Sequence, residues 1–325
     1  MMDHDALLSP FERMLETVAA PAAVRAVEAG GDTDAMWDAV AGSGFLDALV
    51  AEAAGGFGLP VAAVQPLWQA LGRHAVPLPV GETMIARVLL ADAGVPLPDG
   101  PVALAVAAPG QAVVVPLGLV ARHVLVEQDG RLALVAADGA EATGVAGSLA
   151  ARMRWDRLDG MLPAPAGGLR ALAAVLRAAL IAGAADRLVA MTAAYANERA
   201  QFGKPIGRQQ ALQQNLAVMA EEAVAARIAS QLGCAGTWPP SLVAAATAKS
   251  VASRAATRVA ATAHAVHGAI GISAEHDLQL FTRRLHEWRL ADGSESWWNR
   301  QLGAQRLTSG AGSVDYVRAE LTTPA

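Results

Sequence analysis

The sequence predicts a mainly α-helical protein in which a small β-rich module separates two helical domains. Hydrophobic residues make up 54% of the 325 residues and charged residues only 17%, so the chain can bury a sizeable core without disulfides. Apolar residues recur at helical spacing towards both ends of the chain, whereas the middle holds short Val/Leu-rich runs between glycines. We therefore expect domains at residues 1–97, 98–160 and 161–325.

Charge and cysteine content exclude several classes of protein. A net charge of −5 and a pI near 5.8 argue against a nucleic-acid binder. Cys234 is the single cysteine, which rules out a disulfide framework and a multi-cysteine metal site. The N-terminus lacks the order of a secretory signal, and charged residues interrupt the apolar stretch 169–191. We expect a cytoplasmic oligomer with no membrane partner.

The first domain alternates helical patterns with short breaks. Two apolar faces predict helices, one from Trp37, Val40, Phe45 and Leu46 and one from Val64, Leu67, Trp68 and Leu71. The glycine-rich segment 55–60 between them could cradle a phosphate. It lacks both the Lys-Ser/Thr of a P-loop and a preceding β-run, so an ordinary turn between helices is the favoured interpretation.

The middle module consists of predicted strands at residues 111–116, 121–127 and 131–136. The pair Asp129-Gly130 between the last two is a hairpin-type turn signal. The module ends near Trp155, and a Pro/Gly-rich linker follows at 163–168. Three long apolar patterns then predict helices over about 169–195, 212–226 and 241–266, enough for the heart of a bundle.

The break between the first two of these helices carries a candidate binding motif. We expect the first helix to run to about Gln201 or Phe202, with Gly203 in a left-handed cap and Pro205 preventing continuation. Arg199 in the last turn would complement the helix dipole, and its planar guanidinium also suits a phosphate or pyrophosphate. A capped helix with a solvated arginine is the alternative.

This motif resembles the Arg-x-x-Phe-Gly-Lys-x-Ile…Gln-Ala sequence of the acyl-CoA dehydrogenase family, and segment 267–273 resembles the family's Gly-Gly-x-Gly. The order helical, β, helical is also that of the family. The resemblance implies an oligomeric FAD enzyme that introduces a double bond between Cα and Cβ of an acyl-CoA. A carboxylate removes the α-proton and the β-hydrogen leaves as hydride to the flavin. It further implies that Arg199 holds the FAD pyrophosphate across a subunit interface, near Gln201, Phe202, Gln210 and Gly268.

Several residues depart from the family pattern. The β module is about half the usual size and lacks the loop that resembles a flavin contact in relatives. The family's Gly-Gly pair reads Gly268-Ala269, and its preceding glutamine falls on Ala265. Because a methyl group can block close approach of a backbone to a phosphate, the FAD contacts of this segment look weakened.

The catalytic base is the most consequential departure. Asp292 stands where the family has glutamate, and Ser294 stands where it has a threonine that contacts the cofactor. Asp is shorter by one methylene, a reach deficit of about 1.5 Å, and a misplacement of about 1 Å can cost on the order of a hundredfold in rate. Residues 292–294 could instead be the N-cap turn of a helix over 295–301. Glu295 is a weaker candidate for the base.

Three hypotheses follow. With these departures, the chain resembles the short partner subunits of heteromeric acyl-CoA dehydrogenases. We associate such assemblies with bacterial degradation of steroid side chains. The leading hypothesis is such a subunit, working with an acyl-CoA substrate, a second acyl-CoA dehydrogenase subunit and an electron acceptor. The second is a self-sufficient homo-oligomer that uses Asp292 as its base, and the third is a catalytically dead assembly or ligand-binding module.

Other residue groups favour structural roles. His264 and His267 could share a metal, but no third ligand has matching spacing, so hydrogen-bonded histidines are favoured and no metal is expected. Trp288, Trp297 and Trp298 could line a pocket for a bulky acyl or sterol group but more often fill a core or interface. Arginines at 283, 284 and 289 alternate with acidic residues, which indicates a solvated or salt-bridged helix face.

Overall fold

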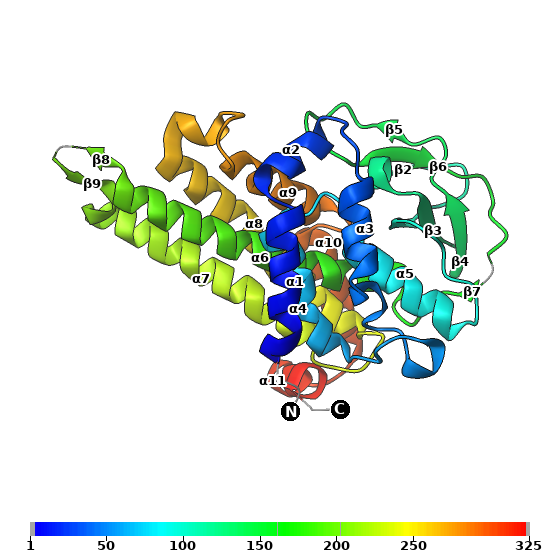
Figure 1. Ribbon diagram of the computed structural model, residues 1–325. Helices are drawn as coiled ribbons and strands as arrows, with labels where there is room; N and C mark the ends of the chain where they lie inside the picture. The colour runs from blue at the N-terminus through cyan, green and yellow to red at the C-terminus, as the bar shows by residue number, and fades with distance from the viewer. Residues whose placement is uncertain (1–3, 161, 202, 323–325) are drawn as a thin grey trace.

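The structure is a computed structural model that describes residues 4–160, 162–201 and 203–322. Its N-terminal part is helical, as predicted (Figure 1), with the helices α1 (His4–Val18), α2 (Pro21–Glu28), α3 (Asp34–Gly42), α4 (Val61–Arg73) and α5 (Val80–Asp92). The glycine-rich segment 55–60 is a turn. Its N–H groups at Phe57, Gly58 and Leu59 donate to carbonyls of residues 47–50, so they are not free to cradle a phosphate and the turn interpretation is confirmed.

The β module lies beside the helical bundle (Figure 1) and holds two small sheets. One has the order β1-β3-β4-β7 and the other the order β2-β6-β5. The hairpin β3–β4 turns at Asp129 and Gly130, both with positive φ, as its sequence predicts. The strands are β1 (Val102–Val106), β2 (Ala112–Val115), β3 (His123–Gln128), β4 (Arg131–Ala136), β5 (Glu141–Ala142), β6 (Ala151–Arg154) and β7 (Leu162–Pro163).

Four of these strands, β1, β5, β6 and β7, were not anticipated from the sequence. Strand β1 is an almost fully buried run of Val, Ala and Leu that pairs in parallel with β3, and short alanine-rich runs carry little β signal. Strands β6 and β7 contribute only a few residues each and are defined by their pairing with distant strands. Strand β7 also overlaps the first residue of the segment expected to be a linker, 163–168.

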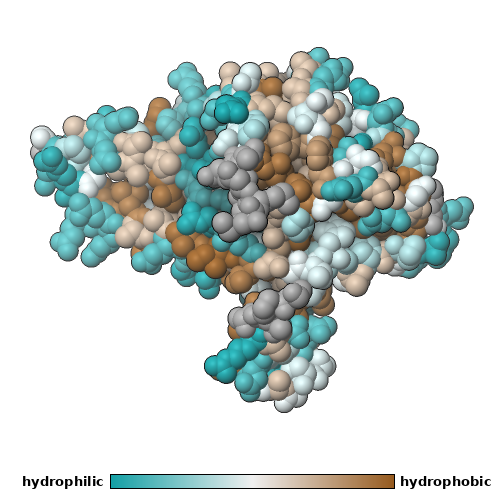
Figure 2. All heavy atoms as spheres, turned by 60° about the horizontal axis from the view of Figure 1, so that its bottom comes forward, coloured by the Kyte–Doolittle hydropathy of each residue, from teal (hydrophilic) through white to brown (hydrophobic). Residues whose placement is uncertain are grey.

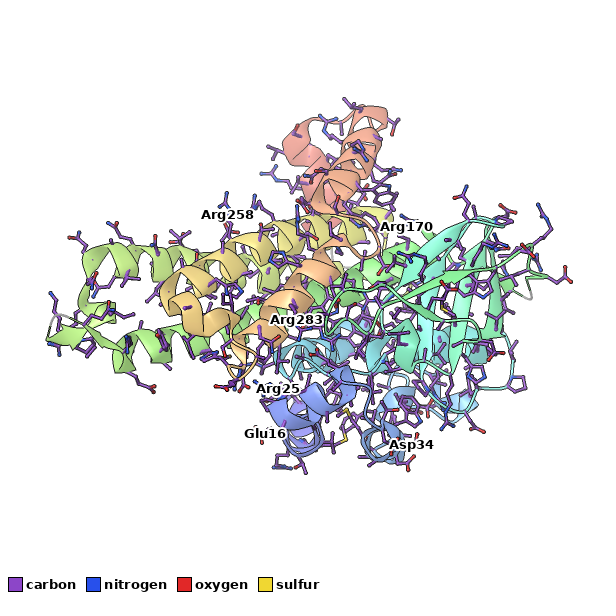
Figure 3. All side chains as sticks on the ribbon, turned by 90° about the horizontal axis from the view of Figure 1, so that it is seen from above. Glu16, Arg25, Asp34, Arg170, Arg258 and Arg283 are labelled. Carbon is purple, nitrogen blue, oxygen red and sulfur yellow. The ribbon has the colours of Figure 1, made fainter. Side chains whose placement is uncertain are left out.

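The C-terminal part is a helical bundle built around α6 (Gly168–Glu198), α7 (Gln210–Gly233) and α8 (Leu242–His267). These three helices are long and lie side by side in Figure 1. Helices α9 (Leu278–Leu290) and α10 (Glu295–Thr308) complete it, followed by the short α11 (Ser313–Val317). Helices α10 and α11 project from the body as an arm (Figures 2 and 3), and Leu307 on this arm is 83% exposed.

Helices α6 and α8 run parallel and in register. Tyr195 near the end of α6 stacks on His267 at the end of α8, with ring centroids 4.3 Å apart. Arg177 in α6 and Lys249 in α8 are also close enough to interact electrostatically. These two residues are separated by the same number of residues along the chain as Tyr195 and His267. The carboxyl ends of both helices therefore meet at one end of the bundle.

Close helix packing also joins the N-terminal part to the bundle. A Cβ atom at Gly183 in α6 would lie 1.8 Å from the Gln69 carbonyl oxygen in α4, and one at Gly72 would lie 2.0 Å from that of Leu180. Only glycine fits at these two positions, because any side chain would collide with backbone. Helix α6 is long and apolar enough to span a membrane, but 89% of its most apolar window is buried inside the protein.

Candidate functional site

The predicted binding motif forms a hairpin at one end of the bundle (Figure 1). Helix α6 ends at Glu198, and Arg199 is its C-cap residue with extended backbone. The two-residue strands β8 (Ala200–Gln201) and β9 (Lys204–Pro205) then pair. The helix is thus shorter than predicted, and Gly203, with φ of +76°, lies in the hairpin turn rather than capping the helix. The extended backbone of Arg199 breaks the helix earlier than the sequence pattern indicated.

We call Arg199, Gln201, Gln210 and Gly268 the hairpin end. The first three are exposed, and their side chains make no hydrogen bond or ion pair with the residues that the structure describes. Gly268 follows α8 at φ 63° and ψ −142°, a conformation that only glycine adopts readily. Phe202, predicted with them, lies outside the described residues.

A small apolar cluster fixes the base of the hairpin end. Ala196, Ile206 and Val266 are buried together, and the Ile206 amide donates to the Arg199 carbonyl oxygen at 2.8 Å. The ends of α6 and α8 are therefore held as one unit, while the Arg199 guanidinium faces outwards. An exposed planar guanidinium without an acidic partner among the described residues suits a phosphate or pyrophosphate group.

The first half of α6 carries a buried cluster of charges, which we call the charged cluster: Glu82, Arg177, Lys249 and Asp292. The Arg177 side chain is completely buried. Its Nη1 lies 2.5 Å from Glu82 Oε1, and its Nε donates to Asp292 Oδ2 at 3.1 Å. Burial alone would lower the pKa of Arg177, but the two carboxylates outweigh it and raise the pKa. Arg177 is therefore a permanent cation that neutralises carboxylates from two parts of the chain.

Lys249 fixes the turn that carries Asp292. Its ammonium group donates to the carbonyl oxygens of Arg289 at 2.9 Å and Gly293 at 2.8 Å, and to Ser253 Oγ at 3.0 Å. Its first two contacts tie the carboxyl end of α9 to the following turn. Burial, partly opposed by Asp292, lowers the pKa of Lys249 to about 7.

The backbone of this turn is also constrained. Asp292 has φ of +58°, which is uncommon for a residue other than glycine. Its carbonyl oxygen accepts a hydrogen bond from Trp298 Nε1 at 3.1 Å. A Cβ atom at Gly293 would lie 2.9 Å from that same indole nitrogen. The turn therefore has one packed conformation, in which the Asp292 carboxylate points at Arg177.

The alternative that residues 292–294 form the N-cap turn of a helix is confirmed, since α10 begins at Glu295, but Asp292 is not the capping residue. Ser294, not Asp292, is the N-cap residue of α10, and it makes no side-chain cap bond. The Asp292 carboxylate prefers the buried guanidinium, because an unpaired buried cation would be far more costly than an uncapped helix end. Glu295, the weaker candidate base, is bound by Arg289, whose hydrogen bonds lower the pKa of Glu295.

The structure thus divides the residues predicted to form one site. Arg199, Gln201, Gln210 and Gly268 gather at the hairpin end, whereas Asp292 and Ser294 lie at the charged cluster. Arg177 and Arg199 are on the same helix and about 30 Å apart along its axis, from the rise of 1.5 Å per residue. One chain cannot use both groups on the same reacting atoms.

The remaining predicted side chains have structural contacts. His264 Nε2 lies 2.9 Å from Thr282 Oγ1, and His267 Nδ1 lies 2.8 Å from the Ala263 carbonyl oxygen. Among the residues that the structure describes, no group of three or more His, Cys, Asp or Glu could hold a metal. Trp288 and Trp298 are buried in the main core, which confirms their packing role.

Comparison with known proteins places this architecture in one class. The family described as acyl-CoA dehydrogenase, C-terminal domain, matches residues 171–308. Acyl-CoA dehydrogenase IpdE2 of Mycobacterium tuberculosis is 33% identical over 296 residues, which cover 85% of this chain and 92% of that protein. The chain therefore belongs to the acyl-CoA dehydrogenase family, whose cofactor is FAD.

Solved structures agree in fold over nearly the whole chain. The steroid ACAD Tcur3481–Tcur3483 is similar with a TM-score of 0.84 and 25% identity, covering 95% of this chain and 99% of that chain. The ChsE4–ChsE5 complex from Mycobacterium tuberculosis is similar with a TM-score of 0.79 and 24% identity, covering 96% and 99%. The predicted order of helical, β and helical parts is confirmed.

Proposed function

We propose that this chain is one subunit of a hetero-oligomeric acyl-CoA dehydrogenase, and that its hairpin end completes the FAD site of a partner chain. The partner holds the main catalytic site. The substrate is a CoA thioester, of the steroid side-chain class. The observation that carries the proposal is the separation of Arg199, exposed at one end of α6, from Asp292, locked by Arg177 in the first half of that helix.

The hairpin end supports the first half of the proposal. Arg199 would hold the FAD pyrophosphate, with Gln201, Gln210 and the backbone of Gly268 beside it. Ser294 lies at the charged cluster and is not part of this pyrophosphate site. An exposed arginine with no acidic partner among the described residues is available to an anion from another chain. Helix α7 also exposes Val218, Val224, Ile228 and Leu232, each at least 38%, and apolar side chains of this kind favour a protein–protein interface.

The charged cluster supports the second half. A general base must be free to reach the proton that it removes. Asp292 is held by Arg177 on a turn that Lys249 and Trp298 fix, and its side chain is 12% exposed. If the Asp292 carboxylate moved away from Arg177, the buried guanidinium would lose one of its two counter-charges, which is strongly unfavourable. Asp292 in this chain is therefore a structural anion, and proton removal falls to the partner.

The comparisons agree with this assignment. Two structurally similar proteins are named as pairs, the steroid ACAD Tcur3481–Tcur3483 and the ChsE4–ChsE5 complex. When bound, FAD accepts the hydride that leaves the β-carbon of the substrate. What this chain adds is the grip on its diphosphate and a stable surface for the partner.

Purification alone and with the partner tests the proposal. The chain expressed alone should be colourless, and it should acquire flavin absorbance when a longer homologue encoded beside it is co-expressed. Reduction of that flavin by an acyl-CoA would then show that the assembly is competent. A yellow chain that is bleached by an acyl-CoA without any partner would instead establish the homo-oligomer that uses Asp292. A chain that binds no flavin with any neighbour-encoded homologue would establish a module without redox function.

A further inference from the structure

Helix α7 has an exposed side that is nearly free of charge. Figure 1 shows this helix at the edge of the bundle, starting at the hairpin β8–β9. A helix face that meets water normally carries charged residues, as α1 does with its exposed Arg13 and Glu16. The exposed residues of α7 between positions 217 and 232 are Ala217, Val218, Glu221, Val224, Ile228, Gln231 and Leu232. This composition indicates contact with another protein surface.

Five positions on this side form one line along the helix, which we call the α7 seam: Val218, Glu221, Ala225, Ile228 and Leu232. They follow one another at alternating spacings of three and four residues, the period of residues that pack against a neighbouring helix. Val218, Ile228 and Leu232 are 48%, 50% and 38% exposed, and the small Ala225 lies between them. A second helix could therefore approach closely and remove these side chains from water.

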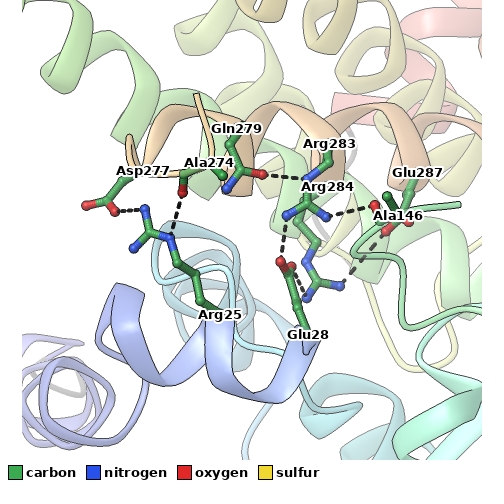
Figure 4. Close-up of polar contacts among 9 residues, drawn as sticks. All are labelled: Arg25, Glu28, Ala146, Ala274, Asp277, Gln279, Arg283, Arg284 and Glu287. Atoms are coloured by element: carbon green, nitrogen blue, oxygen red, sulfur yellow. Dashed lines mark hydrogen bonds and ion pairs between the residues drawn. The ribbon is translucent and has the colours of Figure 1, made fainter. Parts of the chain in front are cut away.

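The remaining seam residue, Glu221, indicates the charge of the surface that covers it. Where helices of this chain cover a carboxylate, they supply cations: Glu28 of α2, whose side chain is 6% exposed, accepts hydrogen bonds from Arg283 at 2.5 Å and Arg284 at 3.1 Å (Figure 4). Glu221 makes no hydrogen bond or ion pair with the residues that the structure describes. Because a covered carboxylate without a cation is strongly unfavourable, the surface that packs on the seam must bring a basic residue.

A second copy of this chain does not provide that residue. If two seams packed in parallel, Glu221 would face its own counterpart, and if they packed antiparallel about Ala225, it would lie between Ile228 and Leu232 of the second copy. Arg227 is the only basic residue of α7, and it lies 3.7 Å from Asp186 of its own chain. The positions that flank the seam are likewise not basic: Ala217, Glu222, Val224, Ala229 and Gln231.

The seam is continuous with the hairpin end. Gln210, which belongs to the hairpin end, is the first residue of α7, and Val218 lies about 12 Å further along the helix axis at a rise of 1.5 Å per residue. A partner chain whose FAD is reached by Arg199 therefore lies beside the start of the seam. One occupant can cover both surfaces.

We propose that the α7 seam binds a helix of the partner dehydrogenase subunit, which carries aliphatic residues at the same period and a lysine or arginine facing Glu221. This inference rests on the proposed function and deepens it, because it names the element that holds the partner. The cation opposite Glu221 makes the pairing selective for the partner over a second copy.

Co-expression of the tagged chain with the longer homologue encoded beside it tests the inference, with the amount of homologue recovered per tagged chain as the measurement. Ile228→Asp places an unpaired carboxylate in the seam, and Glu221→Lys places a cation against the cation of the partner. Each should lower the recovery at least about tenfold. Both residues are exposed in the isolated chain, so both variants should fold, as circular dichroism would show.

Matched controls make the same changes away from the seam. Val145→Asp alters a valine that is 62% exposed in the β module, and Glu52→Lys alters an exposed glutamate in the N-terminal part. Both variants should recover the homologue as the wild-type chain does.

Recovery at the wild-type level by Ile228→Asp and Glu221→Lys would overturn the inference. So would sedimentation of the chain alone as a dimer that Ile228→Asp converts to a monomer, because the occupant would then be a second copy. The proposed function is judged separately, by the flavin content of the recovered complex: Arg199→Ala should keep the homologue and lose the flavin. Full flavin in that variant would overturn the proposed function and leave the seam to be judged by recovery of the homologue, whereas no complex with the wild-type chain would overturn both.

Discussion

Two arginines of the α6 segment have opposite surroundings: Arg177 lies in the first half of the helix, and Arg199 is its C-cap residue. Arg177 is fully buried and shared between two carboxylates, whereas Arg199 is exposed with no partner in the described chain. A buried guanidinium is tied to its own fold by the cost of leaving it unpaired. An exposed one at a helix end is free to bind an anion from outside. The comparison shows that the same residue type serves stability in the first half of the helix and recognition at its end.

Removing the buried arginine should give the largest effect on stability. Arg177→Met leaves Glu82 and Asp292 buried without their shared cation and should lower the free energy of unfolding by about 3–5 kcal/mol. Urea denaturation followed by circular dichroism measures this. Arg254→Met, at a 57% exposed arginine 4.0 Å from Glu222, is the control and should change stability by less than about 0.5 kcal/mol. Equal effects would refute the contrast between buried and exposed arginines.

Neutralising Asp292 should have a smaller effect. Asp292→Asn keeps the shape of the side chain but leaves Arg177 with Glu82 alone, so we expect a loss of about 1–3 kcal/mol in the free energy of unfolding. Turnover of the assembled complex should stay within about twofold of wild type, well short of the roughly 10²–10⁴-fold expected for loss of a general base. Steady-state kinetics of the co-purified complex measures it. Abolished turnover in a complex that still assembles would make Asp292 the base.

The charged cluster also predicts a dependence of stability on pH. The pKa of Lys249 is lowered to about 7 in the folded chain, so between pH 7 and 8.5 the unfolded chain binds more protons than the folded one. Stability should therefore rise with pH over this window, by at most about 1.4 kcal/mol per unit from this residue. Below pH 7 both states are protonated and this contribution is constant. Comparison with Lys249→Met isolates it, and an identical pH slope in the two proteins would argue against a perturbed Lys249.

Much of the fold could be predicted from the sequence, because long apolar patterns such as that of α6 dominate helix formation. The β module was harder, since β1 and β6 are short, alanine-bearing strands whose pairing depends on residues far along the chain. The predicted end of α6 is three or four residues too late, because Gly203 resembles a helix cap and lies instead in a hairpin turn. Local turn chemistry alone does not distinguish these two uses of glycine.

The charged cluster shows which part of the site could not be predicted. Asp292 was identified from its resemblance to a catalytic position, but its partner Arg177, and Glu82 that shares this arginine, come from helices distant in the sequence. The available signal was a charged residue within an apolar run, as at Arg177 between residues 171–176 and 178–185. Such a residue requires a buried counter-charge, although the sequence does not say which one. The hairpin end, by contrast, is contributed mainly by a local motif and could be found directly.

The exposed arginine should give the smallest effect on stability and the most informative effect on cofactor binding. Arg199→Ala should change the free energy of unfolding of the isolated chain by less than about 0.5 kcal/mol, because the side chain has no partner in the described chain. The direct test is the molar ratio of flavin to protein in the co-purified assembly, with Arg13→Ala, an exposed position on α1, as control. We expect the ratio to fall at least severalfold in Arg199→Ala and to stay unchanged in Arg13→Ala. A full complement of FAD in the Arg199→Ala assembly would contradict the account.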